Sequence, residues 1–132
     1  MKRNALAIAG AFCFKDSRSY AQRGLDAELL ARGRRFDGSV YLCGYAVEVG
    51  LKARICPSSP SDFQGLTSFR THNLDVLLHL SGREETIKKR HMSAWSTFAM
   101  WDPEARYLPI GSRSEAEATA MLRSAQEVLS AL

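Results

Sequence analysis

The segment from Val40 to Ile55 constrains the fold more than any other part of this 132-residue chain, because it is apolar around most of a helix. At about 100° per residue, its apolar side chains cover an arc of roughly 240°. Gly44 and Gly50 lie inside this helix, at a cost of about 1 kcal/mol each relative to alanine. We therefore expect a central helix that packs closely at its glycines and buries its second apolar face against another subunit.

The rest of the chain also has the period of a helix, and no segment alternates apolar and polar residues as a strand would. In the first helix, Ala21, Leu25 and Leu29 are expected to face inward. The pattern predicts an all-α, up-and-down bundle of four to five helices, in one domain that spans residues 1–132. The expected helices cover residues 17–34, 37–55, 74–81, 84–101 and 114–132.

Three helix starts carry capping signals. Asp37 is a candidate N-cap for the central helix, and Thr71 or Asn73 for the third. Ser114 with Glu117 has the spacing of a capping box. These signals fix where the expected helices begin.

Composition argues against a disordered or fibrous protein. With 45% hydrophobic and 24% charged residues, the chain is expected to fold as one globular domain. The formal net charge is +4, and residues 1–60 carry ten basic and five acidic side chains, so we expect basic surface mainly in the first half. Three cysteines without metal-ligand spacing indicate reduced thiols, no metal and a cytoplasmic protein.

The first residues allow a second interpretation. Lys2 and Arg3 precede the apolar stretch from Ala5 to Phe14, which has the shape of a short secretory signal. No clear cleavage site follows, and the stretch leads directly into a helical pattern, so we favour an extension of the first helix. No apolar run approaches the roughly 18 residues that a membrane span needs.

The polar stripe of the central helix is the first candidate site. It consists of Tyr41, Tyr45, Glu48 and Lys52. Glu48 and Lys52, four residues apart, suit either an ordinary helical ion pair or the wall of a cleft for a charged ligand. His72 can cap backbone N–H groups or contact that ligand. Arg106 with Tyr107 can fold back onto the bundle, where the arginine would grip a phosphate or a carboxylate.

The order of these features resembles the HEPN family of small helical domains. The resemblance covers about residues 15–132 and leaves residues 1–14 unmatched. It is carried by four pieces of sequence: the run RFDGSVY at 35–41, the run GYAVEVGLKA at 44–53, the run THNL at 71–74, and Trp101 followed by Arg106 and Tyr107.

The resemblance implies a helical bundle, a homodimer formed through the second-helix side, and pairing with a minimal nucleotidyltransferase as toxin and antitoxin. Many family members are metal-independent ribonucleases that need an arginine four to six residues before a histidine. None of His72, His79 and His91 has an arginine at that spacing, and the nearest, Arg83 before His91, has seven intervening residues. We therefore predict no catalytic residues and no cofactor.

The sequence thus predicts a non-catalytic HEPN-type dimer that binds a nucleotide or an RNA phosphate and acts with a nucleotidyltransferase partner. Its expected binding residues are Tyr45, Glu48, Lys52, His72, Arg106 and Tyr107. One alternative is a divergent ribonuclease that uses Arg83 or Arg90 with His91. A purely structural dimerisation module is the other.

Overall fold

The computed structural model describes residues 17–55, 71–99 and 101–132. All regular elements within these ranges are helical, which confirms the all-α class for this part of the chain. They are α2 (Ser17–Arg32), α3 (Phe36–Ile55), α4 (Leu74–Ser81), α5 (Glu84–Arg90), α6 (Met92–Ser96), the 3-10 helix η2 (Pro103–Tyr107) and α7 (Glu115–Ala131). The predictions for residues 1–14 lie outside the described residues.

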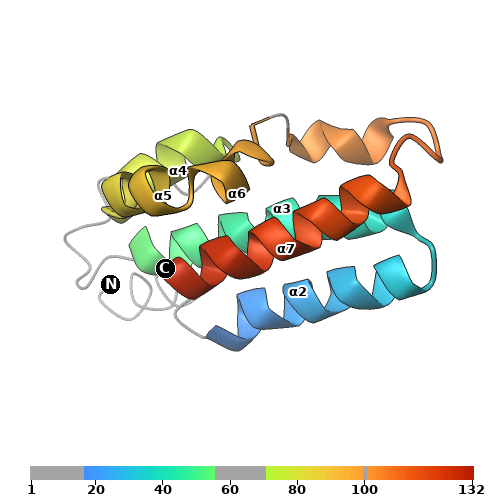
Figure 1. Cartoon of the computed structure of the whole chain (residues 1–132), viewed down its shortest axis with the longest axis horizontal. Helices are drawn as coiled ribbons and strands as arrows, with labels where there is room; N and C mark the ends of the chain where they lie inside the picture. Colours follow the sequence, from blue (N-terminus) through green and yellow to red (C-terminus); the bar gives the residue numbers. More distant parts are fainter. Residues whose placement is uncertain (1–16, 56–70, 100) are drawn as a thin grey trace, which may run out of the picture.

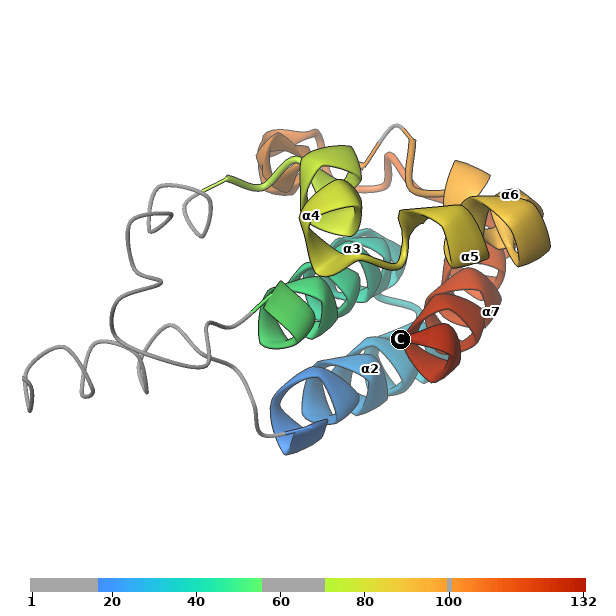
Figure 2. The same cartoon turned by 90° about the vertical axis from the view of Figure 1, so that its left-hand side faces the viewer.

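Three long helices form the body of the molecule. Figure 1 shows α2 running antiparallel to α3, while α7 runs in the same direction as α3. The short helices α4, α5 and α6, followed by η2, make the return path between α3 and α7. Seen from the end in Figure 2, α2, α3 and α7 pack as a triangle, with α4 above α3.

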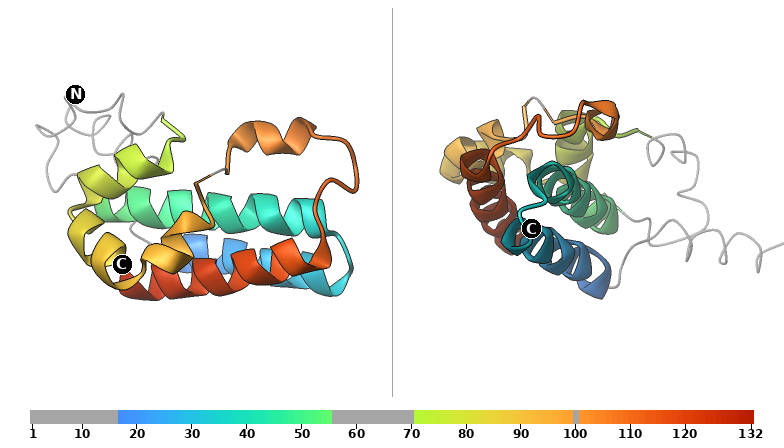
Figure 3. Two further views of the ribbon diagram at one scale, coloured as in Figure 1. Left: turned by 45° about the horizontal axis from the view of Figure 1, so that its top comes forward. Right: turned by 90° about the vertical axis from the view of Figure 1, so that its right-hand side faces the viewer.

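Helix α3 is the centre of this arrangement, as its composition predicts. It contacts α2, α7, α4 and η2, and Figure 3 shows α4 over one end of it and η2 over the other. Both apolar arcs are buried within the single chain: Val47 and Leu51 are fully covered, and so are Ala46 and Val49. Contrary to expectation, no second subunit is needed to cover either arc, because other elements of the described chain pack against α3.

The two glycines of α3 receive neighbouring side chains. A Cβ atom added to Gly44 would lie 2.0 Å from the Trp101 indole, and one added to Gly50 would lie 2.6 Å from Leu129. These contacts account for glycine inside a helix despite its conformational cost. The close packing predicted at both positions is confirmed.

Helix α2 differs from its prediction. Leu25 and Leu29, expected to face inward, are 59% and 68% exposed. The buried position is Ala27, whose carbonyl accepts a hydrogen bond from the buried Ser39 hydroxyl of α3 at 2.8 Å. Small residues let helix backbones approach closely, and this approach turns the leucines away from α3.

Two further boundaries need correction. Asp37 is not an N-cap: α3 begins at Phe36, and the Asp37 carboxylate accepts hydrogen bonds from the Gly111 and Arg113 backbone N–H groups. The single helix expected over 84–101 is broken at His91, whose backbone is not helical. This break lets Ile87 before it and Trp95 after it both enter the core.

The remaining capping signals are confirmed. Asn73 caps α4 through its side-chain oxygen, and Ser114 with Glu117 forms the capping box of α7. Gly82, in the left-handed conformation with φ 76°, ends α4.

No helix in the described ranges is long and apolar enough to cross a membrane.

Candidate functional site

A buried carboxylate lies at the centre of the candidate site. The Glu48 side chain is 2% exposed, and its two oxygens have different partners. One lies 3.4 Å from Lys52 Nζ, one helical turn along α3, and the other lies 2.7 Å from His72 Nδ1. A buried carboxylate needs this kind of compensation, because burial of an unpaired charge costs several kcal/mol.

The three side chains of this cluster differ in their access to solvent. Lys52 is 8% exposed, whereas His72 is 55% exposed. Glu48 engages Nδ1 of the imidazole, and the second ring nitrogen is the atom with which His72 can bind a ligand. His72 is therefore the outward member of the cluster, and Lys52 acts from beneath it through its charge.

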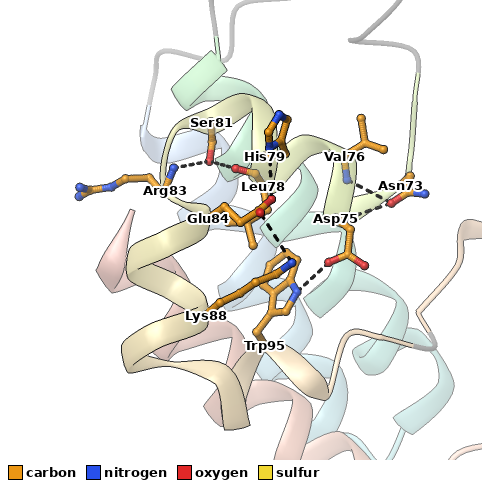
Figure 4. A network of polar contacts seen from close by, with 10 residues as sticks. All are labelled: Asn73, Asp75, Val76, Leu78, His79, Ser81, Arg83, Glu84, Lys88 and Trp95. Carbon is orange, nitrogen blue, oxygen red and sulfur yellow. Dashed lines mark hydrogen bonds and ion pairs between the residues drawn. The ribbon is translucent and has the colours of Figure 1, made fainter.

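Local structure holds His72 in place. It immediately precedes Asn73, whose side-chain oxygen accepts the N–H groups of Asp75 and Val76 at 3.0 and 3.2 Å. The Asp75 carboxylate in turn accepts a hydrogen bond from Trp95 Nε1 at 3.0 Å, which joins α4 to α6 (Figure 4). The start of α4 is thus fixed to two other helices.

A hollow of about 340 Å³ adjoins His72. Its aromatic lining is Trp95, Phe98 and Trp101, and its acidic lining is Asp75, Asp102 and Glu104. The three carboxylate residues are exposed, whereas the three aromatic side chains are buried. The hollow therefore combines aromatic side chains with carboxylate acceptors that N–H donors of a ligand could meet.

Trp101 connects this hollow to the tyrosines of α3. Its ring lies 6.3 Å from Tyr41, which stacks on Tyr45 at the same centroid distance. The Arg23 guanidinium of α2 lies 5.7 Å from the Tyr45 ring centroid. Tyr45 therefore packs toward α2. It does not line the hollow itself, and the contacts of Tyr41 with Trp101 connect it to the hollow.

The predicted residues are brought together only in part. Glu48, Lys52 and His72 form one contiguous cluster. Arg106 belongs to η2, which contacts α3, and its side chain lies outside the described residues. Tyr107, also in η2, is 70% exposed.

Sequence reasoning missed the wall of the hollow. Trp101 enters the sequence analysis only through the family resemblance, and Trp95, Phe98, Asp102 and Glu104 are not among the predicted binding residues. The available signal was the sequence WDPE at 101–104, in which carboxylates directly follow a tryptophan at the end of a helical segment.

The other titratable candidates have partners elsewhere. His91 Nδ1 lies 2.9 Å from the Glu127 carboxylate of α7, and His79 Nδ1 lies 3.4 Å from Glu84. An Arg83 N–H group donates to the Leu132 carbonyl at 3.4 Å. The described residues contain no group of three or more His, Cys, Asp or Glu side chains that could hold a metal ion.

The chain matches no family model, no curated protein and no solved structure.

Proposed function

We propose that this chain is a non-catalytic HEPN-type domain that binds a nucleotide, or an unpaired nucleotide of RNA, at the hollow beside His72. The observation that carries the proposal is the contact of His72 with the buried Glu48–Lys52 pair at the rim of an aromatic hollow. Glu48, Lys52 and His72 are also residues on which the HEPN resemblance depends. We also propose that the helices form an up-and-down bundle of the HEPN type.

The charges around the hollow determine how a nucleotide would bind. Three carboxylates line the hollow and would repel a phosphate placed inside it. They suit the amino and imino groups of a base, which would lie against Trp95 or Trp101. The phosphate would remain outside, on the side of His72. This geometry favours a nucleoside monophosphate over a triphosphate.

Calorimetric titration with AMP, GMP and ATP tests this proposal. The monophosphates are expected to bind more tightly than ATP, and His72→Ala is expected to weaken AMP binding by roughly tenfold, the equivalent of one charge-assisted hydrogen bond. His79→Ala is the matched control, because His79 is an exposed histidine of α4 that contacts Glu84. Absence of heat with all three nucleotides, or equal loss in both variants, would refute the proposal.

Incubation with total RNA addresses the ribonuclease alternative. In the described residues, Arg83 contacts the Leu132 carbonyl and His91 contacts the Glu127 carboxylate of α7, so the two side chains do not face a common group. We expect no cleavage by the purified protein. Cleavage that disappears in His91→Ala would instead establish the divergent ribonuclease.

We further propose that the protein forms a homodimer through α2 and acts with a nucleotidyltransferase partner. The apolar stripe of Ala21, Leu25 and Leu29 is exposed on one face of α2. A two-fold pairing would set this apolar stripe against itself. Sedimentation of the wild type and of Leu25→Ser/Leu29→Ser tests the dimer, and a neighbouring nucleotidyltransferase gene would support the partner. If neither protein dimerises, the α2 interface is wrong.

A further inference from the structure

The hollow beside His72 offers a ligand more hydrogen-bond acceptors than donors. The carboxylates of Asp75, Asp102 and Glu104 line it, and its described lining contains no lysine or arginine. Within the described ranges of the chain, none of these carboxylates forms an ion pair. A ligand that meets this wall must therefore supply N–H groups of its own.

The carboxylates differ in how many acceptor positions they leave for a ligand. One Asp75 oxygen accepts from Trp95 Nε1 at 3.0 Å, and one Asp102 oxygen accepts from the Glu104 backbone N–H at 2.8 Å. Figure 4 shows the other Asp75 oxygen on the side away from Trp95. Both Glu104 side-chain oxygens are without a hydrogen-bond partner among the described residues. Glu104 is therefore the carboxylate that can accept two parallel hydrogen bonds from one ligand.

Few side-chain donors of this wall remain available. Trp95 Nε1 already donates within the protein, and Trp101 Nε1 is buried. The Asn73 side-chain oxygen caps α4, which leaves its amide nitrogen as a donor. Figure 4 shows this nitrogen on the side away from the capped N–H groups. Apart from the His72 ring nitrogen, the lining thus offers a free carboxylate and one amide donor.

The bases of RNA differ in the edge that they present to such a wall. Guanine has two adjacent donors, N1–H and the 2-amino group, beside its O6 acceptor. Adenine, cytosine and uracil each place an acceptor atom directly beside their donor. A carboxylate that meets this donor also faces the lone pair of the acceptor, which is left unpaired and repelled. The wall therefore favours guanine.

We propose that the hollow selects guanine, with Glu104 accepting from N1–H and the 2-amino group and Asn73 donating to O6. This inference rests on the nucleotide site proposed above and adds the identity of the base. The volume of about 340 Å³ is at the small end of ligand sites, which span roughly 300–1,000 Å³, and so suits a single base. Free GMP and an unpaired guanosine of RNA present the same edge to this site.

Calorimetric titration with GMP, IMP and AMP tests the choice of base. IMP keeps N1–H and O6 but lacks the 2-amino group. We expect GMP to bind roughly tenfold more tightly than IMP, the equivalent of one hydrogen bond to a charged group, and IMP more tightly than AMP.

Glu104→Gln places an amide N–H group where guanine needs an acceptor. This variant is expected to bind GMP roughly tenfold more weakly and to lose most of the preference for GMP over AMP. Glu85→Gln is the matched control, because Glu85 is an exposed glutamate of α5 that does not line the hollow. Both substitutions replace exposed side chains, so the fold is expected to remain intact.

The outcomes separate this inference from the nucleotide site on which it rests. Absence of binding by every nucleotide would refute both. Equal affinity for GMP and AMP, with both weakened in His72→Ala, would refute guanine selection and leave the nucleotide site in place. A GMP affinity that is unchanged in Glu104→Gln, or reduced equally in Glu85→Gln, would also refute guanine selection.

Two labelled pentanucleotides, UUGUU and UUAUU, distinguish the two sources of guanine. Fluorescence anisotropy is measured with and without excess GMP, so that only binding displaced by GMP is counted. Tighter displaceable binding of UUGUU than of GMP itself would identify an unpaired guanosine of RNA as the ligand. GMP binding without displaceable RNA binding would identify the free nucleotide. Equal displaceable binding of the two RNAs would refute guanine selection.

Discussion

Helices α2 and α3 contain the same local motif, a glutamate followed four residues later by a basic residue, and use it differently. The Arg32 and Glu28 side chains of α2 are 74% and 38% exposed, with 2.9 Å between their charged atoms. The Lys52 and Glu48 side chains of α3 are 8% and 2% exposed, and Glu48 also engages His72. One motif yields a surface ion pair in α2 and the base of a candidate binding site in α3.

The difference comes from what covers each helix. Helix α3 contacts four other elements, and the Trp101 indole rests against Gly44. Helix α2 contacts α3 and α7, and its leucines at 25 and 29 remain exposed. Hydrophobicity along a helix therefore does not decide burial by itself, because the packing partners select which face is covered. Matched substitutions in the two helices test this interpretation.

The largest expected effect is that of Glu48→Ala. It leaves Lys52 buried without a partner and is expected to reduce the free energy of unfolding by about 3–5 kcal/mol. The matched change Glu28→Ala removes the exposed pair of α2 and should cost about 0.2–0.5 kcal/mol. Urea denaturation of both variants measures the difference. Similar losses in the two helices would show that the Glu48 cluster is not buried in solution.

Leucine truncation extends the comparison to apolar side chains. Leu51→Ala removes a fully buried side chain and is expected to cost about 2–5 kcal/mol, from lost transfer energy and the resulting cavity. Leu29→Ala removes an exposed side chain and should change stability by less than about 0.5 kcal/mol in the monomer. Denaturation at low protein concentration separates this effect from dimer formation. A large loss of stability in Leu29→Ala would show that this side chain is buried in the monomer.

Glycine substitutions are expected to have opposite signs in the two helices. Gly44→Ala forces a Cβ atom against the Trp101 indole and should cost about 1–3 kcal/mol, despite the better helix propensity of alanine. Gly24→Ala meets nothing within 4 Å and should stabilise α2 by about 0.5–1 kcal/mol. Thermal unfolding measures both shifts. Stabilisation by both substitutions would exclude the close approach of Trp101.

The smallest effect concerns Cys43, which α3 buries in the core. Burial raises the pKa of this thiol from 9.0 to about 12, so the unfolded chain loses its proton at lower pH than the folded one. Stability contributed by Cys43 is thus complete below pH 9 and is expected to fall by about 1.4 kcal/mol at pH 10.

Comparison with Cys43→Ala isolates this contribution from other groups that titrate in the same range. The stability difference between the wild type and Cys43→Ala should shrink by that amount from pH 7 to pH 10. A difference independent of pH would show that the thiol is accessible to solvent.

Helix positions were largely predictable because their signals are local. Asn73, Gly82 and the Ser114–Glu117 box act within a few residues of themselves, and each terminus was predicted correctly. The break at His91 has a non-local cause, because it lets Ile87 before it and Trp95 after it both pack into the core. Asp37 accepts hydrogen bonds from Gly111 and Arg113 in the loop before α7. These residues lie 74 and 76 positions after Asp37 in the sequence, a separation that no local pattern reveals.

The candidate site was predictable where it followed one helix. Glu48 and Lys52 were identified from their spacing, and His72 from its position before the N-cap of α4. Their convergence on one carboxylate depends on how α4 packs on α3. The hollow could not be predicted, because residues of α4, α6 and the segment before η2 meet only in the folded chain.

By itself, the sequence determined a helical chain with a dominant central helix, helix ends set by capping residues, and a polar stripe on that central helix. These properties follow from periodicity and short-range hydrogen bonds. Only the tertiary structure decided which apolar faces are covered, how His72 meets Glu48, and which carboxylates line the hollow. Each of these depends on contacts between segments far apart in the chain, where packing selects one arrangement among several that the local pattern allows.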